Sequence, residues 1–287
     1  MAAHPRARGA GAATARGAHG MSKSRFPGPA LRGGPALCLD ALSYARRVFG
    51  NDDEHWFGTP ALLAVCRPMA QSLHPDWFVL PLREWVQAWW QAHGRPGQGM
   101  VKPRRALQAR LEDPRLRAAL LDALRALHSA IGSTAGLALQ IDGPGPWLSW
   151  VGAAADVDAL DGADAEDVSV YLAALLHRLA GSGLGALVVQ QQAGLGTDPA
   201  ELYAALTNAA GHHGWPCVLC SATTHGVPRG FDALAVHPAI PGMGLWCNEA
   251  NWVRQATPGV PFVVARVPAQ AAPDDVLAQI ARWRNQS

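Results

Sequence analysis

The sequence has no uninterrupted apolar run of the roughly 18 residues that a transmembrane helix needs, so we expect no membrane span. We also find no secretory signal, and the five cysteines form an odd set that disulfides within the chain cannot pair completely. Buried, reduced thiols in a cytoplasmic protein best explain these residues, which are Cys38, Cys66, Cys217, Cys220 and Cys247.

Acidic residues are absent from positions 1–35, which hold six of the 24 Lys and Arg residues. The rest of the chain therefore has 18 basic and 22 acidic residues, and it lacks the basic footprint of a nucleic-acid-binding protein. The first 35 residues also offer few side chains that a core would bury. They are expected to be a disordered tail or an over-extended reading frame with Met21 as the natural start. A transit peptide and a basic arm for an acidic partner stay open.

No glycine-rich dinucleotide fingerprint follows the early strands, which argues against an open, doubly wound sheet. The chain instead contains short, almost wholly apolar runs, which are typical of parallel strands buried on both faces. Seven or eight such runs predict one (β/α)8 barrel over residues 36–287, with the open sheet as the alternative. The runs are Trp77–Leu82, Leu137–Ile141, Trp147–Val151, Ala186–Gln190, Cys217–Cys220, Ala233–Val236, Gly244–Cys247 and Phe262–Val267.

Helical patterns fill most of the remaining chain. Leu39–Phe49 is expected to be a short helix, and Thr59-Pro60 combines a capping residue with a first-turn proline. The last strand leads through a turn into a helix that begins at Pro273, where two aspartates suit the positive helix end. The other expected helices cover 83–92, 104–131 with an interruption at Asp113-Pro114, 164–179 and 198–210.

Polar side chains follow several of these strands, and barrels bind their ligands at the carboxyl ends of the strands. Asp142, His225 and His237 are the candidates for proton transfer, since carboxylates and imidazoles act as general acids and bases. Arg266 is the candidate for holding a substrate carboxylate, because a guanidinium in an apolar context needs an anionic partner. An internal ion pair between Arg266 and Asp142 is an equal alternative.

Further residues near the strand ends are expected to contact a substrate. Each also has a plainer interpretation: a solvated loop for the glutamines and the arginine, a helix cap for the asparagine, and core packing for the tryptophan. The expected substrate-binding residues besides Arg266 are Gln190, Gln192, Arg229, Asn248, Glu249 and Trp147.

Three residues near strand ends have the side chains that zinc prefers, namely Cys220, His225 and Cys247. Cys217 is excluded from the same site, because residues three apart in a strand point to opposite faces of the sheet. Incidental buried thiols explain the cysteines better. We therefore expect no cofactor, with zinc as the alternative.

The second half of the chain, from about residue 130, resembles the superfamily of uroporphyrinogen decarboxylase and cobalamin-independent methionine synthase. The resemblance rests on DVSVYLAALLHRLAGSGLGALVVQQQ at 167–192, LQIDGPGP at 139–146, LYAALTNAAGHHGWPCVL at 202–219 and ARVPAQAAPDDVL at 265–277. It implies a (β/α)8 barrel with a pocket at the carboxyl ends of the strands. The implied chemistry is decarboxylation or methyl transfer.

The residues that carry chemistry in that superfamily differ here. Zinc-dependent methyltransferase members have His-x-Cys where this chain has Cys220 and Ala222, and the decarboxylase branch has a histidine near Ala265 and Arg266. The decarboxylases' N-terminal arginine motif has no counterpart in this chain. Three functions follow: a barrel protein that acts on or binds a small carboxylated molecule, a non-catalytic binding or partner protein, or a methyltransferase with relocated zinc ligands. A homodimer is left open.

Overall fold

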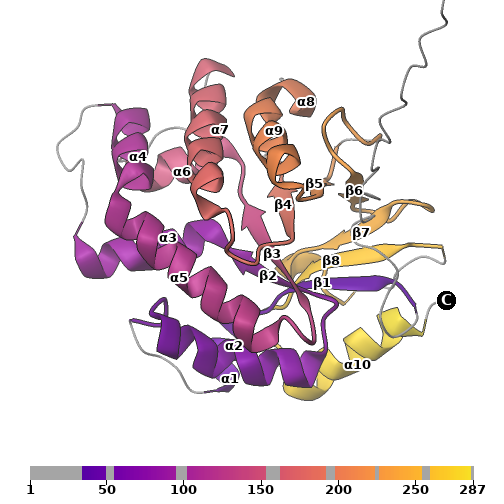
Figure 1. Cartoon of the computed structure of the whole chain (residues 1–287). Helices are drawn as coiled ribbons and strands as arrows, with labels where there is room; N and C mark the ends of the chain where they lie inside the picture. The colour runs from indigo at the N-terminus through magenta and orange to yellow at the C-terminus, as the bar shows by residue number, and fades with distance from the viewer. Residues whose placement is uncertain are drawn as a thin grey trace, which may run out of the picture.

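Eight parallel strands close into a barrel in the order β1 to β8, with helices around it (Figure 1). This computed structural model confirms the predicted (β/α)8 fold. It describes residues 34–49, 55–94, 102–152, 162–191, 198–223, 226–253 and 259–285. Across those residues, none of the helices has the length and apolar character that a membrane crossing demands. The expected tail over 1–35 lies almost wholly outside the described residues.

Each strand is short and pairs in parallel with its neighbours, and the pairing of β1 with β8 closes the barrel. The strands are β1 (Ala36–Asp40), β2 (Trp77–Pro81), β3 (Gly136–Ile141), β4 (Ala186–Gln190), β5 (Cys217–Ser221), β6 (Ala233–Val236), β7 (Gly244–Cys247) and β8 (Phe262–Arg266). Seven of the eight coincide with runs that the sequence predicts.

Proline sets the start of several helices, since its fixed φ suits the first helical turn and its missing N–H is not needed there. It stands in the first turn of α2, α4, α5, α6, α8 and α10. The helices are α1 (Leu42–Val48), α2 (Thr59–Leu73), α3 (Leu82–His93), α4 (Pro103–Glu112), α5 (Pro114–Ile131), α6 (Pro144–Val151), α7 (Gly162–Leu176), α8 (Pro199–Leu202), α9 (Ala204–His213) and α10 (Pro273–Arg284), with the 3-10 turns η2 (His177–Leu179) and η3 (Glu249–Asn251).

The prediction of a helix over Leu39–Phe49 is wrong at its start. The run ALCLD forms β1, which is buried along its whole length and is inserted between β2 and β8. The helix begins only at Leu42, whose backbone N–H donates to Asp40 Oδ1 at 3.4 Å. The strand is hard to recognise because a single residue separates it from α1.

The prediction of a strand over Trp147–Val151 is also wrong, since these residues belong to α6. Gly143 is extended, and Pro144 then begins the helix directly after β3. The apolar run reflects burial of one helix face against α4 and α7, which stand beside α6 (Figure 1). Short apolar runs do not by themselves distinguish a buried helix from a strand.

The interior of the barrel is apolar along most of its length and polar at one end. Alternate residues of the strands face inward, and the buried interior cluster is Ala36, Cys38, Val79, Ala138, Ala186, Val188, Val218, Cys220, Ala235, Phe262 and Val264. The next inward position towards the carboxyl end is Asp40 in β1, Gln140 in β3, Gln190 in β4 and Arg266 in β8. The polar end of the interior is therefore where the strands terminate.

Candidate functional site

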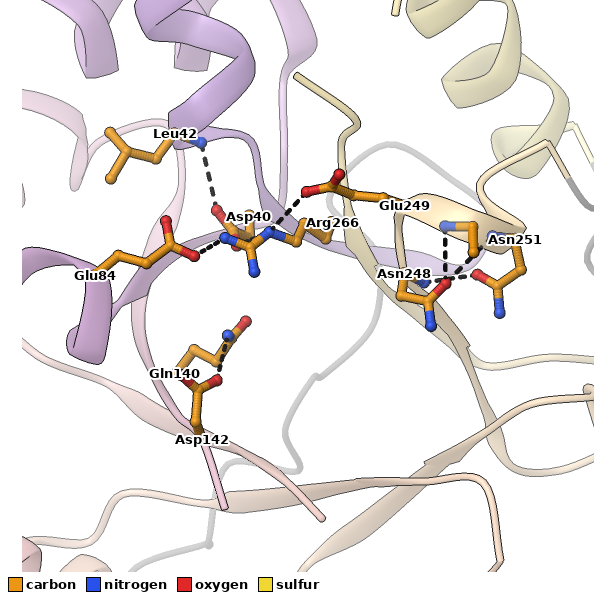
Figure 2. Close-up of polar contacts among 10 residues, drawn as sticks. Asp40, Leu42, Glu84, Gln140, Asp142, Asn248, Glu249, Asn251 and Arg266 are labelled. Carbon is orange, nitrogen blue, oxygen red and sulfur yellow. Dashed lines mark hydrogen bonds and ion pairs between the residues drawn. The ribbon is translucent and has the colours of Figure 1, made fainter. Parts of the chain in front are cut away.

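Arg266 lies at the centre of an ion-pair cluster at the carboxyl end of the barrel. Asp40 and Arg266 are paired in register at the ends of β1 and β8, and both side chains face inward. Arg266 Nε lies 3.4 Å from Asp40 Oδ2 and 3.4 Å from Glu249 Oε1. A terminal guanidinium nitrogen of Arg266 donates to Glu84. Figure 2 shows the three carboxylates converging on this one guanidinium.

The carboxylates of Glu84 and Glu249 lie just after the ends of two strands of the barrel. Glu84 lies in the first turn of α3, which begins immediately after β2. Glu249 begins η3, which follows β7, and the Asn248 side chain caps this turn by accepting from Ala250 N at 3.0 Å and Asn251 N at 3.2 Å. Since β7, β8, β1 and β2 are consecutive around the barrel, the cluster occupies one arc of the mouth.

The surroundings of Asp40 shift the pKa of its carboxyl group. Its residue is 3% exposed, and burial raises the pKa of Asp40 to about 6. The positive charge of Arg266 and the N–H of Leu42 oppose this rise in pKa, while the negative charges of Asp142 and Glu249 add to it. Asp40 therefore gains and loses its proton close to neutral pH, where an ordinary aspartate stays ionised.

A second cluster lies beside the first and contains Asp142. Arg83 Nε donates to Asp142 Oδ2 at 2.5 Å, and Gln140 Nε2 donates to Asp142 Oδ1 at 3.2 Å. Arg83 and Glu84 are consecutive in the first turn of α3, so one helix start serves both clusters. The side chain of Arg83 is 23% exposed, and within the described residues its only ion pair is the one from Nε to Asp142.

The structure brings several of the expected site residues to this mouth. Asp142, Glu249 and Arg266 belong to the two clusters, and Gln190 ends β4 in a half-buried position. His237 follows β6, which lies three strands from β1 in the barrel order. The sequence predicts that Arg266 holds a substrate carboxylate or forms an internal ion pair with Asp142. In the structure Arg266 does form internal ion pairs, and its partners are Asp40, Glu84 and Glu249.

Two other residues that the sequence predicts to contact a substrate, Asn248 and Trp147, have structural roles instead. Asn248 caps η3, as the plainer interpretation has it. Trp147 is fully buried and packs edge-on against Trp150 at a ring separation of 6.2 Å, so it belongs to the core. Arg229 is exposed in the connection between β5 and β6, and among the described residues it forms no ion pair with either cluster. Gln192 and His225 lie outside the described residues.

The cysteines of the suggested zinc site lie on different sides of the barrel wall. Cys220 belongs to the barrel interior, whereas Cys217 and Cys247 pack in the layer between the barrel and the helices. This confirms that Cys217 and Cys220 point to opposite faces, and it separates Cys220 from Cys247. Burial raises the pKa of Cys217 to about 12, and raises the pKa of Cys220 too, which disfavours their thiolates. In the described part of the chain, no three His, Cys, Asp or Glu residues are arranged as metal ligands.

Known structures share this architecture at low sequence identity. A methyltransferase from Methanosarcina mazei is 13% identical with a TM-score of 0.58, over 91% of this chain and 96% of that chain. The carboxyl transferase domain from Rhizobium etli pyruvate carboxylase is 10% identical with a TM-score of 0.40, over 88% of this chain and 47% of that chain. No protein-family model and no curated protein matches the sequence. The likeness to the methyltransferase shows the fold.

The sequence patterns do not predict three of the residues at the mouth as site residues, namely Asp40, Arg83 and Glu84. Asp40 follows an inward Cys38 by two positions in LCLD, which is the period of a strand, but that strand is not recognised. Arg83 and Glu84 are the second and third residues after the strand WFVLP, and Asp142 is the first residue after β3. The rule that barrels bind ligands just after their strands would have identified both Arg83 and Glu84 as candidates.

The arrangement gives the mouth two chemical capabilities. Asp40 is a buried acid that is partly protonated near neutral pH, with Arg266 beside it to stabilise its anion. Arg83 presents a guanidinium whose terminal nitrogens make no ion pair with another described residue. A proton donor and an anion-binding group at one end of a barrel are the elements of acid–base catalysis on an anionic substrate.

Proposed function

We propose that the protein is a (β/α)8 enzyme that acts on a small carboxylated molecule at the mouth of its barrel, by proton transfer through Asp40. The observation that carries the proposal is the position of Asp40: 3% exposed, with a pKa of about 6, and 3.4 Å from Arg266 Nε. Catalytic acids are tuned towards the working pH in this way, by burial and charged neighbours. The resemblance to the uroporphyrinogen decarboxylase superfamily supports the same class of enzyme.

Decarboxylation is the reaction that suits these groups best. The carbon–carbon bond to the carboxylate breaks, CO2 leaves, and the bonding electrons stay on the substrate carbon next to a carbonyl or ring that delocalises them. Protonated Asp40 gives its proton to this carbon, and solvent returns a proton to Asp40 afterwards. Arg266 stabilises the Asp40 anion that is formed in between.

The guanidinium of Arg83 is the group that we assign to the substrate carboxylate. Arg266, which the sequence favours for this role, already faces three carboxylates, so we assign it to Asp40 instead. Arg83 holds Asp142 through Nε and is 23% exposed, which leaves its terminal nitrogens to a ligand at the mouth. Such nitrogens bind a carboxylate with two charge-assisted hydrogen bonds. In this assignment Asp142 positions Arg83 rather than transferring a proton.

The two alternatives from the sequence receive less support. A zinc-dependent methyltransferase needs thiol and imidazole ligands on one side of the wall, whereas Cys220 and Cys247 lie on opposite sides. A non-catalytic binding protein has no need of a buried carboxyl group with a raised pKa at its mouth. A measurement of substrate turnover distinguishes the hypothesis of an enzyme from that of a non-catalytic binding protein.

CO2 release from oxaloacetate, acetoacetate and 2,4-dihydroxybenzoate tests the proposal, with buffer blanks for spontaneous loss. We expect release above the blank from at least one compound, and a loss of about 100-fold or more in kcat for Asp40→Asn. Arg83→Gln should raise KM for the carboxylate by about tenfold, since one ionic anchor is lost. Arg229→Gln is the matched control, because Arg229 is exposed and forms no ion pair with the described residues of the two clusters. Turnover that survives Asp40→Asn contradicts the assignment of the acid.

A further inference from the structure

A cavity of about 350 Å³ lies between η3 and α10, next to the ion-pair cluster at the mouth. The residues that matter for its chemistry are Glu249, Trp252, Pro268, Asp275, Gln279 and Arg282. Only Glu249 belongs also to the Arg266 cluster. The volume suits a small ligand of one or two rings. The proposed decarboxylation makes no use of this space.

One wall of the cavity is apolar and includes Trp252. Trp252 is 4% exposed and packs edge-on against Trp283, with ring centroids 4.8 Å apart. Trp283 is a fully buried residue of α10, and its ring packs against the Trp252 indole. Pro268 and Ala271 line the same space. Such a wall packs against a planar apolar group of a ligand.

The charged groups of the cavity favour a cation. Glu249 is 54% exposed at its side chain, and Asp275 is exposed in the first turn of α10. Asp274 and Asp275 together already offset the positive end of that helix, so its N–H groups offer little to an anion. The positive side chain of Arg282 donates to Gln279, which is 2% exposed, at 3.4 Å.

We propose that this cavity binds a primary amine with a flat apolar body. The ammonium group lies between Glu249 and Asp275, and the ring system lies against Trp252 and Pro268. The side-chain amide of Gln279, which Arg282 orients, adds a neutral polar contact. This site goes beyond the proposed function, because the amine occupies a separate space from the carboxylated substrate; Glu249 is the residue that lines this space and also belongs to the Arg266 cluster.

Tryptamine is the probe, and isothermal titration calorimetry of the full chain is the measurement. We expect saturable binding that weakens by about fivefold or more in Glu249→Gln and in Asp275→Asn, since each removes one ionic partner of the ammonium. Asp274→Asn is the matched control: it removes another exposed carboxylate of the same helix turn, one that does not line the cavity. Its affinity should stay within about twofold of that of the wild type.

Indole-3-propionate has the same ring with an anionic end, and it should not bind at concentrations that saturate with tryptamine. Equal binding of this anion, equal weakening by Asp274→Asn, or no heat with millimolar tryptamine overturns the proposal. Among the described residues, Asp275 forms no ion pair with Arg266, so its variant remains informative even where Glu249→Gln disturbs folding. Asp40→Asn should bind tryptamine normally, and this separates failure of the amine site from failure of the proposed decarboxylation.

Discussion

At the scale of single residues, the mouth of the barrel is unusual in placing three carboxylates around one guanidinium. Asp40 is the most buried of the three, at 3% exposure, and Arg266 does not compensate fully for the loss of its hydration. The charges of Glu249 and Asp142 make ionisation of Asp40 still less favourable. The raised pKa is therefore a property of the whole cluster, and it follows from burial first and from neighbouring charge second.

This perturbation predicts a pH-dependent stability. The folded-state pKa of Asp40, about 6, exceeds the ordinary value of 3.8, so the group's contribution is fully present below about pH 4 and is lost as pH rises through 6. The loss amounts to about 3 kcal/mol in the free energy of unfolding. Asp40→Asn does not titrate, so the wild type should lose this much relative to the variant between pH 4 and pH 7. Urea unfolding across that range measures it, and a constant difference between the two proteins contradicts it.

At the scale of elements, large and small inward residues complement one another inside the barrel. Trp77 of β2 covers Gly136 of β3, and Phe262 of β8 covers Gly244 of β7. A Cβ atom on Gly244 would lie 2.1 Å from a ring atom of Phe262, which is too close for any side chain. The aromatic rings can fill the interior only because their neighbours have no side chain.

Gly244→Ala should therefore destabilise the protein by about 1–3 kcal/mol, because Phe262 must leave its position in a close-packed interior. Gly211→Ala is the matched control, since an added Cβ there meets nothing within 4 Å and the residue lies inside α9. It should stabilise by about 0.5–1 kcal/mol through the higher helix propensity of alanine. Chemical denaturation followed by circular dichroism gives both values. A Gly244→Ala protein as stable as the wild type contradicts the packing argument.

The predicted and the observed strands together show how much of the fold and of the candidate site the sequence predicts. Seven strands are recognisable because each is a short apolar run, and Asp142, Glu249 and Arg266 are recognisable because they lie at or just after the ends of those runs. Asp40 is missed with its strand, because β1 meets α1 after one residue and the boundary falls inside one apolar stretch. Its pairing with Arg266 depends on closure of β1 against β8, a tertiary contact that no local pattern contains.

At the scale of the whole molecule, a polar contact opposite the mouth joins the first and last elements of the barrel. Asp76, just before β2, accepts from Leu37 N of β1 at 2.8 Å and lies 3.0 Å from Arg284 Nη1 at the end of α10. Arg284 also donates to the carbonyl of His74 at 2.8 Å. The side chains of Asp76 and Arg284 are only 5% and 14% exposed, so water screens the pair weakly.

Arg284→Ala should destabilise the whole barrel by about 2–4 kcal/mol, because it removes the Arg284 guanidinium from the buried carboxylate of Asp76 and detaches α10 from the start of β2. Closure makes every strand depend on both neighbours, so unfolding should remain one transition with coincident tryptophan fluorescence and circular dichroism. Arg178→Ala, at an exposed arginine of η2, is the control and should change stability by less than about 0.5 kcal/mol. Guanidinium chloride unfolding distinguishes the outcomes. An early, separate transition in Arg284→Ala would show that α10 detaches alone and that the contact does not serve closure of the barrel.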